Sequence, residues 1–182
     1  MMIGVGLLAF GGILMLLQEN SIEEMVEVQD GSSDSTIIDT DIAKDSIKEV
    51  VDEDGTRHVP TLDMSGWEVS EVPMNVFGHT ELVVLNLSNN NLSGALQAEV
   101  RHLKNLERLD LSYNQFTGVP AEVGQLSKLR YLDLSHNQLT GLPYELGNLQ
   151  NLETLVLTGN DYSTHDLDII KEKLPDSVEI VR

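Results

Sequence analysis

A repeat with a short, regular period constrains this chain more than any other feature of its sequence. The segment Leu129–Asn151 reads LRYLDLSHNQLTGLPYELGNLQN, and the segment before it, Leu106–Lys128, reads LERLDLSYNQFTGVPAEVGQLSK. Such self-similarity indicates stacked units, because a single unit cannot bury its own apolar face. Successive units are spaced by 23, 24, 23 and 23 residues, and they begin at Val59, Leu82, Leu106, Leu129 and Leu152.

Each unit combines two kinds of apolar spacing. The L-x-L core predicts a strand with Leu132 and Leu134 on its inner face, because side chains alternate along a strand. The residues expected to point outward are Tyr131, Asp133 and Ser135. Later apolar residues have helical or turn-like spacing and are expected to return to the same core: Leu142, Leu146 and Leu149.

The repeated core resembles the leucine-rich repeat family, whose pattern L-x-x-L-x-L-x-x-N is matched by Leu129, Leu132, Leu134 and Asn137. The resemblance implies an α/β fold, a solenoid of short right-handed coils with a parallel β-sheet on its concave side. It also implies that one recurring asparagine satisfies backbone groups where each coil leaves its strand: Asn90, Asn114, Asn137 and Asn160. The turn residues that follow are scaffold as well: Gly94, Gly118, Gly141, Pro120 and Pro143.

The N-terminal residues 1–22 predict a transmembrane anchor or signal segment, a hydrophobic helix preceding the solenoid. Residues 1–17 carry no charged side chain, and about 17 apolar residues are the lower limit for spanning a bilayer. A cleaved signal peptide is disfavoured, because no basic residue and no A-x-A-like site is present. A helix buried in a soluble protein is disfavoured by the glycines Gly4, Gly6, Gly11 and Gly12.

Orientation follows from the basic residues. The first one after the apolar run is Lys44, so nothing retains the downstream flank in the cytoplasm. We therefore expect a membrane-anchored protein with its repeats on the extracytoplasmic side, and secretion after signal-peptide cleavage is the alternative.

The segments between the anchor and the repeats have their own character. Residues 23–41 are rich in acidic and small polar residues and predict a flexible acidic linker. Residues 42–58 are expected to form an N-terminal cap, with a short helix over Ile42–Val51. Asp52–Gly55 lacks the ligand spacing of a calcium loop and predicts an acidic turn.

The repeats span residues 59–161 and depart from their pattern in the first unit, where Trp67 replaces the asparagine. We expect that coil to close differently. Residues 162–182 predict a C-terminal cap helix and edge strand. Ser163 or Thr164 can cap a helix over HDLDIIKEK, Pro175 ends it, and SVEIV can form the strand.

No residue pattern points to catalysis. The chain has no cysteine, and none of its five histidines has the spacing of a zinc protease motif. Asp110 and Asp133 occupy one position of successive units, and paired carboxylates can serve acid–base chemistry. Both belong to the repeated phrase LDLS, so we interpret them as recurring surface residues. We predict no enzymatic activity, no metal and no cofactor.

The outward strand positions form the expected binding surface. Their rows are Thr61, Val84, Arg108, Tyr131 and Thr154, then Asp63, Asn86, Asp110, Asp133 and Val156, then the Ser/Thr row from Ser65 to Thr158, with Asn89, Tyr113 and His136 beyond. Aromatic residues and arginine most often anchor interfaces. The predicted partner-binding residues are Arg108, Tyr131, Tyr113 and His136, with Asp110 and Asp133 as an acidic rim.

These features predict a membrane-tethered, non-catalytic module that binds a protein or peptide through its concave face. With 11 basic and 30 acidic residues, and a net charge of −19, the chain should repel nucleic acid and favour a basic partner. A structural or adhesive envelope spacer without a specific ligand is the alternative. Extracellular animal and plant members of the family commonly carry cysteine-paired caps, so the absence of cysteine favours a bacterial origin.

Overall fold

A computed structural model describes residues 47–51 and 58–182 of the chain. The predicted anchor at 1–22, the linker at 23–41 and the acidic turn at Asp52–Gly55 lie outside these residues. In the part of the chain that is described, no helix is long and apolar enough to cross a membrane.

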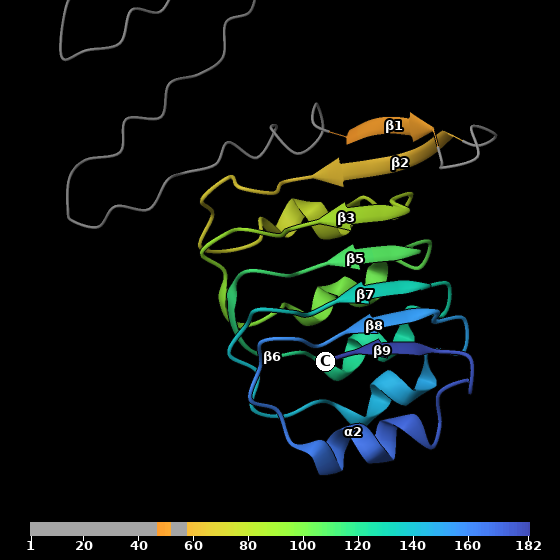
Figure 1. The fold of residues 1–182 in the computed structure, drawn as a ribbon. Helices are drawn as coiled ribbons and strands as arrows, with labels where there is room; N and C mark the ends of the chain where they lie inside the picture. Colours follow the sequence, from red (N-terminus) through yellow and green to blue (C-terminus); the bar gives the residue numbers. More distant parts are fainter. Residues whose placement is uncertain (1–46, 52–57) are drawn as a thin grey trace, which may run out of the picture. The chain divides into compact units, whose positions relative to one another are not determined.

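The repeats build one main sheet, in which strands of consecutive units lie side by side (Figure 1). All neighbours from β2 to β9 are parallel, whereas β1 runs antiparallel to β2. The strands, in their order across the sheet, are β1 (Ile47–Val51), β2 (His58–Asp63), β3 (Val84–Asn86), β5 (Arg108–Asp110), β7 (Tyr131–Asp133), β8 (Thr154–Val156) and β9 (Glu179–Val181).

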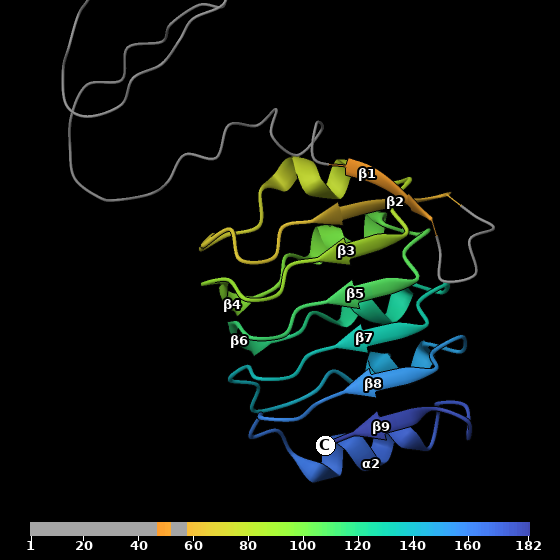
Figure 2. The same cartoon turned by 45° about the horizontal axis from the view of Figure 1, so that its top comes forward.

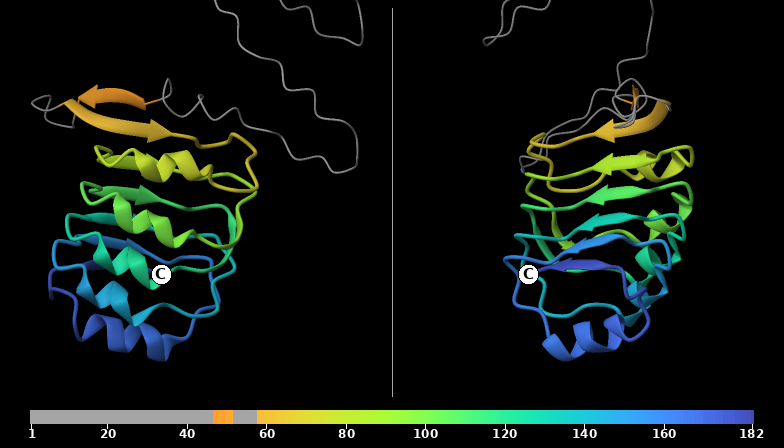
Figure 3. Two further views of the ribbon diagram at one scale, coloured as in Figure 1. Left: turned by 180° about the vertical axis from the view of Figure 1, so that it is seen from behind. Right: turned by 45° about the vertical axis from the view of Figure 1, so that its right-hand side comes forward.

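Short helices line the opposite side of the coils (Figure 3). They confirm the helical or turn-like spacing of the later leucines in each unit. Pro120 and Pro143 immediately precede two of them, and both have the φ near −70° that proline imposes at a helix start. The helices are the 3₁₀ helices η1 (Met74–Gly78), η2 (Ala98–His102), η3 (Ala121–Gln125) and η4 (Tyr144–Asn148), and the α-helix α2 (Thr164–Lys171).

A second, two-stranded parallel sheet forms on the turns that leave the main sheet (Figure 2). Its strands are β4 (Ser93–Ala95) and β6 (Gln115–Gly118), which pair from Ser93 to Gln115 onward. These turns therefore pair with one another as the strands do, but with a shift of register between Gly94 and Ala95.

The interior is a continuous column of leucines between the sheet and the helices. Leu132 and Leu134 are 0% and 1% exposed, as predicted for the inner face of a strand. The return segment contributes Leu146 and Leu149, which are also fully buried. Each coil thus covers its neighbours, and loss of one such leucine to alanine costs about 2–5 kcal/mol.

The four recurring asparagines form a buried ladder, which we call the asparagine column. Asn137 Nδ2 donates to the carbonyl oxygens of Leu111 (3.0 Å) and Leu134 (3.1 Å), and its Oδ1 accepts the Phe116 N–H (3.0 Å). Asn90, Asn114 and Asn160 make the equivalent bonds, each to its own coil and to the coil before it. The predicted scaffold role of these residues is confirmed.

The expected helix over Ile42–Val51 is wrong where the structure describes it, because Ile47–Val51 is strand β1. β1 pairs with β2 from Ile47–Leu62 to Val51–His58. Without that pairing, the edge of β2 would expose its backbone hydrogen-bonding groups. Pairing with the edge of β2 therefore stabilises a strand here, although the spacing of the apolar residues is helical.

The predicted outward orientation of the serine row is also wrong in the central coils. Ser88, Ser112 and Ser135 are only 5–6% exposed. Their backbone N–H groups donate to the side chain two residues earlier, as in Ser135 N to Asp133 Oδ1 at 2.9 Å. This local bond turns the chain inward as the strand ends.

The first and last coils differ from the central ones. Trp67, at the asparagine position of the first unit, is 36% exposed and does not enter the asparagine column. At the other end, Ser163 Oγ accepts the Asp166 N–H (3.4 Å) and caps α2, which buries Leu167 and Ile170. The helix and edge strand predicted for this region are both present.

Candidate binding surface

The solvent face of the main sheet, opposite the 3₁₀ helices, is the concave face. The strand register places its two outward rows as the sequence predicted. Arg108 lies beside Tyr131, and Asp110 lies beside Asp133, on the adjacent strands β5 and β7. The structure therefore brings four of the six predicted partner-binding residues together.

Arg108 and Tyr131 are in direct contact. The Arg108 Cζ atom lies 3.8 Å from the centre of the Tyr131 ring. A guanidinium over an aromatic face is held by a cation–π attraction of about 0.5–1 kcal/mol at an exposed site. The pair is thus ordered before any partner arrives, and less conformational entropy is lost on binding.

Tyr131 also donates a hydrogen bond from its hydroxyl to Asp133 Oδ2, at 3.0 Å. Partial burial raises the pKa of Tyr131, and the charge and hydrogen bond of Asp133 raise this pKa further, while Arg108 acts in the opposite direction. The hydroxyl therefore stays protonated at neutral pH and keeps its role as a donor.

The carboxylates of Asp110 and Asp133 are partly committed to the scaffold. Asp133 Oδ1 accepts bonds from Ser135 N and Ser135 Oγ (2.6 Å), and Asp110 Oδ1 binds Ser112 in the same way. Within the described ranges, no donor occupies Asp110 Oδ2. Asp110 can therefore offer one carboxylate oxygen to a partner, whereas both oxygens of Asp133 are already engaged.

Tyr113 and His136 lie apart from the strands, on the turns one residue after the buried serines. Their rings stack at a centroid distance of 4.3 Å and an interplanar angle of 17°. Both residues have a positive φ, 54° and 52°, which non-glycine residues rarely adopt. We call this position the turn column; its members, all with positive φ, are Gly66, Asn89, Tyr113, His136 and Gly159.

The sequence places Asn89, Tyr113 and His136 just beyond the strand rows, and the composition of the full turn column carries a further signal. Glycine and asparagine are the residues that best tolerate a left-handed conformation, and they hold three of its five places. That composition could have shown that Tyr113 and His136 belong to a turn rather than to the concave face.

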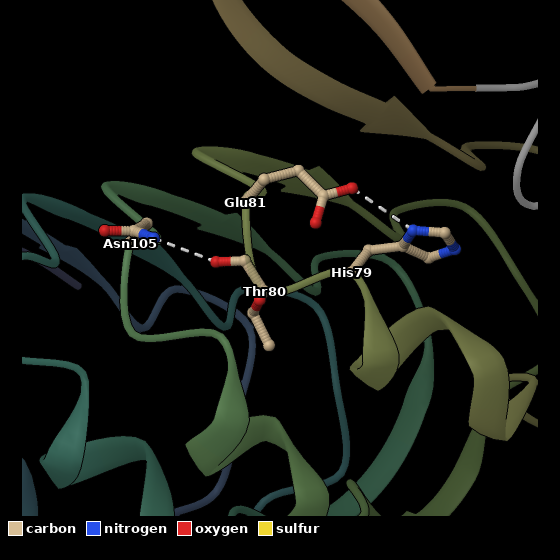
Figure 4. Close-up of polar contacts among 4 residues, drawn as sticks. All are labelled: His79, Thr80, Glu81 and Asn105. Carbon is tan, nitrogen blue, oxygen red and sulfur yellow. Dashed lines mark hydrogen bonds and ion pairs between the residues drawn. The ribbon is translucent and has the colours of Figure 1, made fainter.

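At the other end of the strands, the turns that enter them are cross-linked by side chains. Asn105 Nδ2 donates to Thr80 O at 2.9 Å, and His79 Nδ1 lies 3.3 Å from Glu81 Oε1 (Figure 4). The next coils continue the pattern, with Lys128 Nζ on Asn105 Oδ1 and Asn151 Nδ2 on Ser127 O. The contacts of Asn105 and Asn151 join coil to coil, whereas the contact between His79 and Glu81 lies within one turn.

Arg130 on these entry turns is paired rather than available. Its Nη2 lies 2.7 Å from Glu153 Oε1, and this hydrogen bond and charge raise the pKa of Arg130. Both side chains are more than half exposed, so solvent and salt weaken the pair. Among the described residues, no cluster of histidine and carboxylate side chains could hold a metal ion.

Comparison with protein families identifies the repeats. Residues 104–161 match the family model of the leucine rich repeat, and residues 80–121 match the model of leucine rich repeats in two copies. Residues 80–161 are therefore similar to leucine-rich repeats, and the solenoid described above is the fold that this resemblance implied. The search of curated proteins gives no match.

Solved structures support the same fold. A leucine-rich-repeat protein of Leptospira interrogans is 40% identical with a TM-score of 0.59, over 63% of this chain and 29% of that one. The ectodomain of the Arabidopsis thaliana receptor kinase GASSHO1/SCHENGEN3, in complex with Casparian strip integrity factor 2, is 35% identical with a TM-score of 0.55, over 66% and 15%. This chain thus spans less than a third of either protein.

A third similar structure is closer in length. The ectodomain of the Arabidopsis thaliana receptor kinase SOBIR1 is 28% identical with a TM-score of 0.55, and the match covers 74% of this chain and 76% of that one. The match therefore covers about three quarters of each of the two chains.

Proposed function

We propose that this chain is a non-catalytic binding module that captures a protein or peptide partner through its concave face. The observation that carries the proposal is the preordered cluster of Arg108, Tyr131 and Asp133 at the centre of the sheet. Support comes from GASSHO1/SCHENGEN3, whose similar solenoid was solved in complex with another factor.

The cluster has the composition of an interface anchor. Arginine and tyrosine dominate binding hot spots, and the smaller neighbours in the same row, Val84 and Thr154, leave room for a partner beside them. Asp110 contributes a carboxylate oxygen that can accept a bond from a lysine or arginine. Together with the net charge of −19, this favours a basic partner. Tyr113 and His136 border the surface where the strands end.

Residues 1–22 are proposed to anchor the module in a membrane, and residues 23–41 to hold it away from the surface on an acidic linker. A bacterial envelope protein with its repeats on the extracytoplasmic side fits this arrangement, and a secreted form after cleavage is the alternative. Protease added to intact cells should remove the repeats; repeats protected until the membrane is opened would contradict this topology.

The binding proposal is tested by crosslinked affinity capture with the full chain as bait. The double variant Arg108→Ala/Tyr131→Ala should weaken capture of the main partner about tenfold or more. Arg130→Ala is the matched control, because it removes an arginine from the entry turns instead of the concave face. Equal capture by the unsubstituted protein, the double variant and the Arg130→Ala control would place the partner on a surface other than the concave face. Capture of no discrete partner would favour a structural spacer.

A further inference from the structure

A second exposed surface, distinct from the concave face, is formed by the turns that leave the strands in the three central coils. We call it the lateral face. It consists of nine side chains in a three-by-three array, all of them exposed: Asn89, Asn91, Ser93, Tyr113, Gln115, Thr117, His136, Gln138 and Thr140. In a chain with 30 acidic residues, this array contains no carboxylate, lysine or arginine. In the first and last coils, the positions equivalent to Gln115 and Gln138 are acidic, Glu68 and Asp161.

Backbone hydrogen bonds join the three coils that carry the array. Ser93 pairs with Gln115 in the β4–β6 sheet, and Gln115 N donates to Leu92 O at 2.8 Å. The next coil continues the ladder through Gln138 N to Phe116 O at 2.9 Å. Polar side chains of adjacent coils, such as Ser93 and Gln115, therefore lie at about the 4.8 Å spacing of neighbouring strands, and the register shifts between Gly94 and Ala95. The result is an ordered surface of amide and hydroxyl groups rather than a loose loop.

The stacked rings of Tyr113 and His136 add an aromatic pair to this surface. A Cβ atom on Gly159 would lie 2.6 Å from His136 Nδ1, so the His136 ring packs against that turn. Tyr113 remains 54% exposed despite the stacking. The part of the Tyr113 ring that His136 does not cover is thus accessible within the array, and the positive φ of both residues fixes where the rings stand.

We propose that the lateral face binds an uncharged polysaccharide. Neutral amides and hydroxyls can both donate and accept hydrogen bonds, which suits the hydroxyl groups of a sugar chain. An exposed tyrosine ring offers an apolar face for the C–H side of a sugar ring.

Charge and composition argue against the other ligand classes. The net charge of −19 disfavours anionic glycans and nucleic acids. The array contains no exposed aliphatic side chain of the kind that forms the apolar core of a protein interface. The ligand class that remains is an uncharged molecule with many hydroxyl groups.

The test is affinity gel electrophoresis of the full chain in a non-ionic detergent, with a soluble polysaccharide in the gel. The uncharged probes are dextran, laminarin and hydroxyethylcellulose, and the anionic probe is alginate. At least one uncharged probe should retard the protein, and alginate should not. Absence of retardation by all three uncharged probes, or retardation by alginate alone, would overturn the proposal.

Two variants assign the binding to this surface. Gln115→Glu/Gln138→Glu keeps the shape of both side chains but adds charge, and it should weaken retardation at least tenfold. Gln125→Glu is the matched control, because this exposed glutamine lies on η3, and it should leave retardation unchanged. Equal retardation of the double variant and the unsubstituted protein would also overturn the proposal. Tyr113→Ala should weaken binding independently of charge, by about tenfold.

Different variants test protein capture by the concave face and polysaccharide binding by the lateral face. Arg108→Ala/Tyr131→Ala should lose protein capture and keep polysaccharide retardation, because neither residue belongs to the lateral face. Gln115→Glu/Gln138→Glu should show the reverse. A third outcome is that no uncharged polysaccharide retards the protein, and that the Gln115→Glu/Gln138→Glu variant no longer captures the protein partner. The lateral face would then be a protein interface, and the polysaccharide proposal would be wrong.

Discussion

The asparagine column and the turn column are adjacent in sequence, yet they differ in almost every other respect. Asn90, Asn114 and Asn137 are identical in type and 7–9% exposed, and each makes the same bonds to backbone groups. The residue just before each of them is exposed, and its type changes from coil to coil. The buried position fixes a side chain, because a specific set of bonds depends on it. The turn position fixes only a backbone angle, so its side chain is free to vary and to acquire a function.

The largest expected effect separates the two columns directly. Asn137→Ala removes the partner of the Phe116 N–H and of carbonyl oxygens on two coils, and an unsatisfied buried group costs about 1–3 kcal/mol. We expect a loss of about 3 kcal/mol or more in the free energy of unfolding, measured with a chemical denaturant. His136→Asn, one residue away, should change it by less than about 1 kcal/mol, because asparagine tolerates a positive φ. Comparable losses would remove the distinction between the columns.

A smaller effect is expected from a comparison of two glycines within the turn column. Gly66 and Gly159 have nearly the same φ, 70° and 72°, so alanine at either position should cost about 1–2 kcal/mol in backbone strain. An added Cβ meets nothing within 4 Å at Gly66, but it meets the His136 ring at Gly159. Gly159→Ala should therefore cost about 0.5–1.5 kcal/mol more, through the disturbed ring stack.

The background His136→Ala provides the control for that difference. With the ring removed, Gly159→Ala and Gly66→Ala should have equal costs in thermal or denaturant unfolding. An excess at Gly159 that persists without the ring would assign the difference to some other contact.

The smallest effect concerns a variable position on the concave face. Tyr131→Phe removes the hydrogen bond to Asp133 and should cost less than about 1 kcal/mol at neutral pH. The pKa of Tyr131 is raised in the folded state, so the folded chain holds this proton more tightly than the unfolded chain. The stabilisation is therefore complete below the unfolded pKa of about 10, and it is lost as the pH rises through the higher folded pKa.

The measurement is the stability difference between the unsubstituted protein and Tyr131→Phe from pH 8 to pH 11. Because the other tyrosines titrate in both proteins, the difference isolates Tyr131. It should shrink toward zero at alkaline pH, and a difference that grows would contradict the raised pKa.

Recurrence explains which parts of this fold could be predicted from sequence. Leu132, Leu134 and Asn137 have counterparts in neighbouring units, and one pattern therefore fixed the core, the strand rows and the asparagine column. Strand β1 has no counterpart, and it forms because the edge of β2 requires a partner, which local spacing does not reveal. The burial of Ser135 depends on a bond to Asp133 two residues earlier, and the outward alternation of a strand ends at that bond.

The candidate site was predictable to the same extent. The strand register placed Arg108 beside Tyr131, since both occupy one position of successive units. Their cation–π contact and the bond from Tyr131 to Asp133 depend on side-chain rotamers, which no repeat pattern specifies. The sequence also places Tyr113 and His136 just beyond the strand rows, but it does not reveal the positive φ that both adopt there.

The asparagine column also gives the solenoid a direction of growth. Each asparagine donates to a carbonyl oxygen in the coil before it, as Asn137 does to Leu111 and Asn114 does to Leu87. On the ribosome, the N-terminal coils emerge first. Each of the first four coils therefore leaves the exit tunnel before the asparagine of the following coil can bond to its turn. In a nascent chain halted between two units, the last coil made would lack the bond from a following asparagine, whereas all earlier coils would already have it.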